Sequence, residues 1–253
     1  LDEYSRGRVR LGISVGALEF LRWVGIKGGH PLSTMRETFE LIRRLLKGER
    51  VEHEGRVFKG WTRDAYIRFK PFREKIPLYL GAQSRQMHEL IGEIGDGGLP
   101  LLLPPEYLGE VLKRVDTGAK RAGRSMEDID LVGSIWISVS RDRESAKTAL
   151  RERITYYGPH LAPDMMGSVG LTSDDFNPIR EAISERDYEK AKSLMTDEMA
   201  EIAVYGTPDD CLDRLEDLAG KGLKHVKFGP PLGPNPREAI RLMGEEIIPQ
   251  LKE

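Results

Sequence analysis

The chain has 253 residues, of which 39% are hydrophobic and 32% charged. This composition is typical of a globular protein with a sizeable core, and it excludes disordered and fibrous classes. The net charge is −2, so charge gives no argument for binding nucleic acid or an anionic membrane surface. There is no run of about 18 apolar residues and no signal-peptide pattern. We therefore expect a cytoplasmic protein with no membrane and no nucleic-acid partner.

Short apolar segments alternate with amphipathic ones along the chain, a pattern typical of βα units and a parallel sheet. The first helix is predicted from the helical spacing of Met35, Phe39, Ile42 and Leu46, with Thr34 and Glu37 as a capping box and Gly48 at its end. Residues 49–76 are expected to form a polar insert with a glycine turn. The predicted strands are residues 8–16, 77–82, 96–103, 129–140 and 223–229.

The second half of the chain contains more breaks between its helical stretches. Residues 141–204 are interrupted by Gly-Pro, Ala-Pro and Asn-Pro pairs, which predicts one barrel helix followed by a helical insertion. Thr207 and Pro208 have the pattern of an N-cap and a first helical residue. A closing helix is expected from Pro236, with its apolar stripe on Ile240, Met243, Ile247 and Leu251.

Five βα units are visible, whereas a closed barrel of this type needs eight. Either three units are missing at the N-terminus or the sheet is open. An open doubly wound sheet would carry a Gly-x-Gly-x-x-Gly fingerprint after its first strand, and this sequence has none there. We therefore predict an α/β fold of the (β/α)8 barrel class, in which residues 1–253 form a single domain that lacks the first three βα units.

The segment Gly81–Met87 joins a predicted strand to a helix start. Its small residues allow a ligand to approach the backbone, and the first helical amides are free to donate. Ser84 and Arg85 add a hydroxyl group and a cation. These features favour a phosphate site at the catalytic face of a barrel. The alternative is that Ser84 only caps the helix.

For two other segments, a ligand-binding role and a purely structural role fit the sequence equally well. The strand end at residues 12–17 is rich in glycine, which suits either a flat ring or tight interior packing. The proline-rich loop at residues 228–236 suits either a stiff wall of the site or a rigid connector.

No pattern in the sequence identifies catalytic or metal-binding residues. The five histidines have no metal-ligand spacing, so we expect no metal site. Glu19 and Asp96 are available acids without a convincing partner. Cys211 lies on an apolar helix stripe with Leu212 and Leu215, and we expect a buried, inert thiol.

The chain resembles the luciferase-like monooxygenase superfamily, and within it the archaeal branch of F420-dependent methylenetetrahydromethanopterin reductases. The segments that carry the resemblance are residues 8–16, 31–48, 76–82, 87–97, 205–210 and 228–234. The ending Pro-Leu-Gly-Pro at residues 231–234 favours the reductase branch.

The resemblance implies an oxidoreductase that transfers hydride between the deazaflavin coenzyme F420 and a small-molecule C1 carrier or related substrate. It also implies cofactor contacts from two loops. Some members carry a catalytic Glu directly after the first strand, where this chain has Ala17 and Leu18. The residues given a cofactor-binding role are Ser14, Val15, Gly16, Gly81, Ala82, Gln83, Ser84 and Arg85.

Three other functions compete with this one. The same barrel could use FMN as a monooxygenase, or bind flavin without turnover as shortened luciferase relatives do. An unrelated barrel isomerase would instead bind sugar phosphates. Apolar faces on an incomplete barrel also lead us to expect a homo-oligomer.

Overall fold

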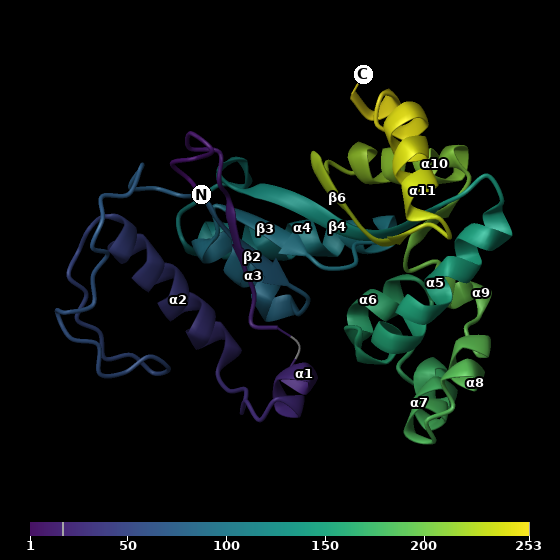
Figure 1. Cartoon of the computed structure of the whole chain (residues 1–253), viewed down its shortest axis with the longest axis horizontal. Helices are drawn as coiled ribbons and strands as arrows, with labels where there is room; N and C mark the ends of the chain where they lie inside the picture. The colour runs from purple at the N-terminus through teal and green to yellow at the C-terminus, as the bar shows by residue number, and fades with distance from the viewer. Residues whose placement is uncertain (17, 253) are drawn as a thin grey trace. The chain divides into compact units, whose positions relative to one another are not determined.

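The computed structural model describes residues 1–16 and 18–252 (Figure 1). The chain divides into two compact units. The first unit comprises Leu1–Leu99 and Arg114–Asp130, and the second comprises Pro100–Lys113 and Leu131–Glu253. Within the described part of the chain, no helix is both long enough and apolar enough to cross a bilayer. The single-domain organisation expected from the sequence stays a prediction.

The first unit is built on parallel strands. Strands β1 (Leu11–Ile13) and β2 (Leu78–Ala82) pair in parallel, with Leu11 opposite Leu78 and Ile13 opposite Leu80. Strand β3 (Gly97–Pro100) follows β2 in the sheet order. Leu78 and Leu80 on one face and Tyr79 on the other are all buried, as expected for a parallel strand covered on both faces. These strands lie within the predicted segments, although β1 is shorter than expected.

Helices connect the strands of the first unit. They are α1 (Leu18–Trp23), α2 (Pro31–Leu46), α3 (Arg85–Ile94) and the second half of α4 (Pro105–Arg121). The backbones of α3 and α4 lie so close together that a side chain on Gly118 would collide with the carbonyl of Glu89. Glycine is therefore required for this approach. The short helix α1 was not predicted from the sequence.

The predicted capping box of α2 is wrong. The helix begins at Pro31, with His30 as its N-cap, because proline has no amide to leave unpaired and its fixed φ suits the first helical position. Thr34 therefore lies inside the helix, where its hydroxyl donates to the carbonyl of His30 over 3.1 Å. Glu37 makes contacts distant in sequence instead. Its carboxylate accepts backbone amides of the insert, including that of Phe58 at 2.8 Å.

The second unit is also organised around parallel pairing. Its long strand β4 (Asp130–Val139) pairs with β5 (Val204–Gly206) and with β6 (His225–Leu232). Ile137 lies opposite Val204, and Ile135 lies opposite Phe228. Strand β5 begins at the last residue of the stretch expected to hold the helical insertion. It was not predicted from the sequence, because three residues are too few to produce a period-2 pattern.

Helices and short turns fill the rest of the second unit. Helices α5–α9 occupy the region expected to be helical, and α10 begins as predicted: the Thr207 side chain accepts the Asp210 amide, and Pro208 is the first helical residue. Their bounds are α5 (Arg143–Tyr157), α6 (Pro163–Ser168), α7 (Asn177–Ser184), α8 (Tyr188–Ser193), α9 (Asp197–Ala200), α10 (Pro208–Gly220) and α11 (Pro236–Leu242).

The apolar stripe of the last helix differs from the prediction at two residues. Ile240 is 57% exposed and Leu251 is 36% exposed, whereas Ala239, Leu242 and Ile247 are buried. The chain changes from an α-helix to a π-helical turn at Met243. The buried face runs through Ala239, Met243 and Ile247 in steps of four residues, so the predicted step of three residues back from Met243 assigns Ile240 to the wrong face.

Candidate functional site

The carboxyl ends of β1 and β2 bring together the two loops to which the sequence assigns cofactor contacts. Ser14 follows β1, and Gly81 is the fourth residue of β2. A Cβ atom placed on Gly81 would lie 2.9 Å from the Cβ of Ser14 and 3.7 Å from the carbonyl oxygen of Ile13. The two loops therefore run side by side within the first unit, as parallel pairing requires.

The loop after β1 is partly exposed. Ser14 and Gly16 are exposed, and Val15 is half-buried. Gly16 has a φ of 73°, a left-handed conformation that favours glycine, and its amide donates to Ser14 Oγ over 3.4 Å. Ala17, which occupies the position of the catalytic Glu in some relatives, lies outside the described residues.

The start of α3 provides hydrogen-bond donors. Ser84 is the N-cap, and its side chain accepts the Met87 amide over 3.4 Å, so the structural role considered for Ser84 is confirmed. The amides of Arg85 and Gln86 precede the first intrahelical bond of the helix and have no partner within it. Together with the positive end of the helix dipole, they can bind an anion. Before them, Ala82 is buried and Gln83 is half-buried.

The first turn of α3 carries no acidic residue, unlike most helices that follow a strand in this chain. The first turns of α4, α5, α10 and α11 each hold at least one carboxylate, namely Glu106, Glu144, Asp209 with Asp210, and Glu238. A carboxylate in the first turn compensates the helix dipole and repels a second anion. The start of α3 is therefore suited to a phosphate on two grounds, its free donors and its lack of negative charge.

Arg85 is directed along the helix. Its guanidinium pairs with Glu89 over 3.2 Å, and the Arg85 side chain is 74% exposed. Glu89 also pairs with Arg121 over 3.1 Å. Hydrogen bonds from Arg121 and then Arg85 lower the pKa of Glu89, so this carboxylate stays ionised. A role for Arg85 in holding the phosphate stays a prediction, because its cation is engaged one turn further along.

Asp96, one of the two acids identified in the sequence, makes contacts that stabilise the fold. Burial alone would raise its pKa, but the pKa is lowered by the Leu78 amide, which donates to it over 3.0 Å, and by Arg43. The Arg43 guanidinium lies 3.0 Å from the carboxylate. Asp96 therefore anchors the amino end of β2, the end opposite the loops that follow β1 and β2. The side chain of Glu19, the other acid, lies outside what the structure describes.

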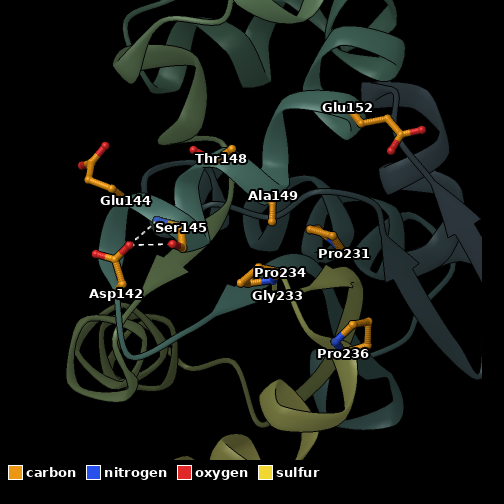
Figure 2. A pocket seen from close by; sticks show the side chains of 10 residues that line it. All are labelled: Asp142, Glu144, Ser145, Thr148, Ala149, Glu152, Pro231, Gly233, Pro234 and Pro236. Atoms are coloured by element: carbon orange, nitrogen blue, oxygen red, sulfur yellow. Dashed lines mark hydrogen bonds between the residues drawn. The ribbon is translucent and has the colours of Figure 1, made fainter.

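The remaining sequence candidates are structural or belong to the second unit. Cys211 is fully buried, and burial raises the pKa of its thiol to about 12, which confirms an inert core residue. The loop at residues 228–236 forms one wall of a pocket with a volume of about 610 Å³ (Figure 2). Among the described residues, no group of three or more His, Cys, Asp or Glu side chains could hold a metal ion.

The other wall of this pocket was not found by sequence reasoning. It is the polar face of α5, which includes Asp142, Ser145 and Glu152. In the sequence this face has the pattern of any solvated face of an amphipathic helix. Only the fold places the proline-rich loop against it.

Comparison with known proteins places the chain in a family. A model of the luciferase-like monooxygenase family matches residues 1–225. The 5,10-methylenetetrahydromethanopterin reductase of Archaeoglobus fulgidus is 36% identical over all of this chain and 76% of its own length. The F420-dependent glucose-6-phosphate dehydrogenase of Microbacterium testaceum is 27% identical over 98% of this chain and 70% of its own length.

A solved structure gives the fold. The coenzyme F420 dependent tetrahydromethanopterin reductase from Methanopyrus kandleri superposes with a TM-score of 0.87 at 29% identity, over 98% of this chain and 75% of that one. The predicted class, an α/β fold of the luciferase-like barrel type, is confirmed by this match. The prediction of an oxidoreductase is confirmed by the same relatives. The chain belongs to the luciferase-like monooxygenase family.

Proposed function

We propose that this chain uses coenzyme F420 to transfer hydride to or from a C1-carrier substrate, as an oxidoreductase of the methylenetetrahydromethanopterin reductase kind. The observation that carries the proposal is the uncompensated start of α3, which lies beside the end of β1 within the first unit. The reductase from Archaeoglobus fulgidus, identical at 36% of the positions across the whole chain, supports this choice of cofactor and reaction.

The residues of the two strand ends fit the phosphate-bearing part of such a cofactor. We assign cofactor contacts to Ser14, Val15, Gly16, Gly81, Ala82, Gln83, Ser84 and Arg85. The amides of Arg85 and Gln86 would donate to the phosphate oxygens. Gly81 leaves room for the backbone to approach, since any side chain there would fill the space against Ser14.

The protein contributes to the reaction by positioning the cofactor. The deazaflavin, when bound, supplies the hydride chemistry. The backbone donors at the start of α3 fix the phosphate, and the residues after β1 limit where the ring can lie. Orientation of this kind lowers the barrier by removing the entropic cost of bringing two reactants into line.

A cofactor-retention experiment tests the proposal. Purified protein is mixed separately with F420 and with FMN, passed through a desalting column, and its absorbance spectrum recorded. We expect F420 to be retained and to lose its oxidised absorbance band when a reduced C1 carrier is added. Retention of FMN with no retention of F420 would overturn the proposal in favour of a flavin monooxygenase. Retention of F420 without any spectral change would show a binding protein that does not turn over.

A further inference from the structure

A network of alternating charges begins at the start of α3 and connects three helices of the first unit, and we refer to it as the arginine–glutamate network. Its two carboxylates, Glu89 and Glu93 on α3, have side chains that are only 15% and 10% exposed. Its three guanidiniums lie on α2, α3 and α4. In order along the network, the residues are Arg85, Glu89, Arg121, Glu93 and Arg36.

Each carboxylate oxygen of the network pairs with one arginine. Glu89 Oε1 pairs with Arg85 over 3.2 Å, and Glu89 Oε2 pairs with Arg121 over 3.1 Å. Arg121 also pairs with Glu93 Oε1 over 2.6 Å, and the other oxygen of Glu93 pairs with Arg36. Three cations therefore share two anions, so the network holds one positive charge that its own carboxylates do not neutralise.

Arg85 is the cation that the network holds least firmly. Among the described residues, Glu89 is its one ionic partner, and the Arg85 side chain is 74% exposed. The cation of this pair lies nearer the N-terminus of the helix than the anion, which is the weaker orientation of an i, i+4 pair because it opposes the helix dipole. Arg121 instead bridges two carboxylates. An anion at the start of α3 would therefore draw Arg85 away before any other member of the network.

The place of Arg85 in the helix gives it access to such an anion. Arg85 is the first residue of α3, and the side chains of a helix lean towards its N-terminus. Its own amide has no partner within the helix. Its guanidinium can donate two parallel N–H groups to phosphate oxygens. One residue can thus offer a backbone donor and a charged side chain to the same phosphate group.

Glu89 keeps a partner when Arg85 leaves. The hydrogen bond from Arg121 is the largest cause of the lowered pKa of Glu89, ahead of that from Arg85, so Arg121 alone can hold this carboxylate in its ionised form. Without Arg121, Glu89 would have Arg85 as its only cation and would hold it more strongly. Arg121 therefore sets how easily Arg85 is released.

We propose that Arg85 passes from Glu89 to the cofactor phosphate when F420 binds, and that Glu89 and Arg121 are positioning residues that set the cost of this transfer. The inference rests on the proposed function and adds a cation that changes partner on binding. Arg121 lies on a different helix and acts on the phosphate through Glu89 and Arg85. Its effect on cofactor affinity therefore requires Arg85 to be present.

Affinities for two ligands test the inference. Fluorescence titration measures the binding of F420 and of a 5-deazaflavin that has a ribityl chain but no phosphate. We expect Glu89→Gln to bind F420 about threefold more tightly, because Arg85 is released from its pair. Arg121→Gln should bind F420 about fivefold less tightly, because Glu89 then holds Arg85 alone. Neither variant should change the affinity for the phosphate-free deazaflavin.

A double variant separates an effect through Arg85 from a direct one. Arg85→Gln alone should weaken F420 binding about tenfold, because a charge-assisted contact with the phosphate is lost. Adding Arg121→Gln to it should weaken F420 binding no further. An equal loss from Arg121→Gln with and without Arg85 would overturn the inference, as would F420 binding that Glu89→Gln weakens or leaves unchanged.

The matched control is Lys120→Gln, which removes the same charge from the residue beside Arg121. Lys120 pairs with Asp116 in its own helix and does not belong to the arginine–glutamate network. This variant should bind F420 like the unmodified protein. A fivefold loss in Lys120→Gln would show that any positive charge on this part of α4 assists binding, and it would also overturn the inference.

An NMR measurement on the unmodified protein tests the transfer without any substitution. The Nε–H signal of Arg85, which donates to Glu89 over 3.2 Å, is followed while F420 and, in a separate sample, inorganic phosphate is added. We expect this signal to shift with either ligand. Binding of F420 with an unchanged Arg85 signal would overturn the inference and leave the proposed function standing. If F420 did not bind, the proposed function would fail, and the phosphate titration would decide the inference by the same signal.

Discussion

The starts of α3 and α5 have the same cap geometry and opposite electrostatics. Each helix follows a strand, and each N-cap side chain accepts the amide three residues later, from Met87 to Ser84 and from Ser145 to Asp142. The two caps differ by one negative charge, and α5 adds Glu144 in its first turn. Serine and aspartate cap a helix about equally well, so stability does not require the difference.

The comparison shows how a repeated fold element can select different ligands. With a neutral cap, the helix dipole and the free amides remain available to an anion. With an anionic cap, the dipole is already compensated, and the surroundings favour donors and cations. The same βα connection is therefore suited to an anion in the first unit and to a neutral or cationic group in the second.

The largest effect is expected when the start of α3 is given the charge of the start of α5. The variant Ser84→Asp keeps a good cap but places a carboxylate close to the cofactor phosphate. We expect F420 affinity to fall roughly 30-fold, which corresponds to about 2 kcal/mol of repulsion in a partly solvated site. Fluorescence titration measures the affinity. If Ser84→Asp left both the melting temperature and the affinity for F420 unchanged, the phosphate would have to lie elsewhere.

A smaller effect is expected from filling the space between the two loops. In Gly81→Ala, the new Cβ would lie 2.9 Å from that of Ser14, so one loop must shift. We expect about tenfold weaker F420 binding and a free energy of unfolding lower by about 1 kcal/mol. Adding Ser14→Gly should restore the stability.

The matched control for this substitution is Gly220→Ala, where an added Cβ meets no atom within 4 Å. It should not lose stability, because alanine is the better helix former. Equal destabilisation by the two alanine variants would show that space against Ser14 is not the cause.

A carboxylate at the opposite end of the strands should affect stability alone. Asp96→Asn should lower the free energy of unfolding by about 1 kcal/mol at pH 7, because the pairing with Arg43 is lost. The folded pKa of Asp96 lies below its ordinary value of 3.8. Its contribution is therefore present above that value and is lost as the pH falls through the folded pKa.

Urea unfolding of the unmodified protein and of Asp96→Asn at several pH values measures this contribution. The difference between the two should be constant near neutral pH and vanish in acid. A difference that grows as the pH falls would contradict the assigned role of Asp96.

The smallest effect is expected from giving α5 the neutral cap of α3. Asp142→Ser keeps a capping side chain, so the melting temperature should change by no more than roughly 2 °C. F420 affinity should not change, since Asp142 does not belong to the loops after β1 and β2. Thermal unfolding and fluorescence titration measure the two quantities, and a clear loss of F420 affinity in Asp142→Ser would contradict the assignment of the phosphate to the start of α3.

The sequence predicts most of the parallel framework because buried strands such as β2 and β4 form continuous apolar runs. It also predicts that the loops holding Ser14 and Gly81 meet, since the carboxyl ends of parallel strands lie at one edge. Thr207 and Pro208 mark the start of α10 by purely local chemistry, which a sequence pattern captures.

Interactions between distant residues were not predictable in the same way. Glu37 has the spacing of a capping box with Thr34, yet its carboxylate binds amides some 20 residues away. Helix α11 buries Ala239 and Leu242 and exposes Ile240, a choice of face that depends on how the helix packs and that its own sequence pattern does not give. The pocket between α5 and the proline-rich loop arises from two segments nearly 90 residues apart, and neither is unusual alone.

The central claim is that the cofactor phosphate lies at the start of α3, and backbone amide chemical shifts test it most directly. An NMR spectrum of isotope-labelled protein is recorded before and after F420 is added. We expect the largest shifts at the amides of residues 84–87, with those of residues 142–145 nearly unchanged. Large shifts at residues 142–145 with none at residues 84–87 would contradict the account.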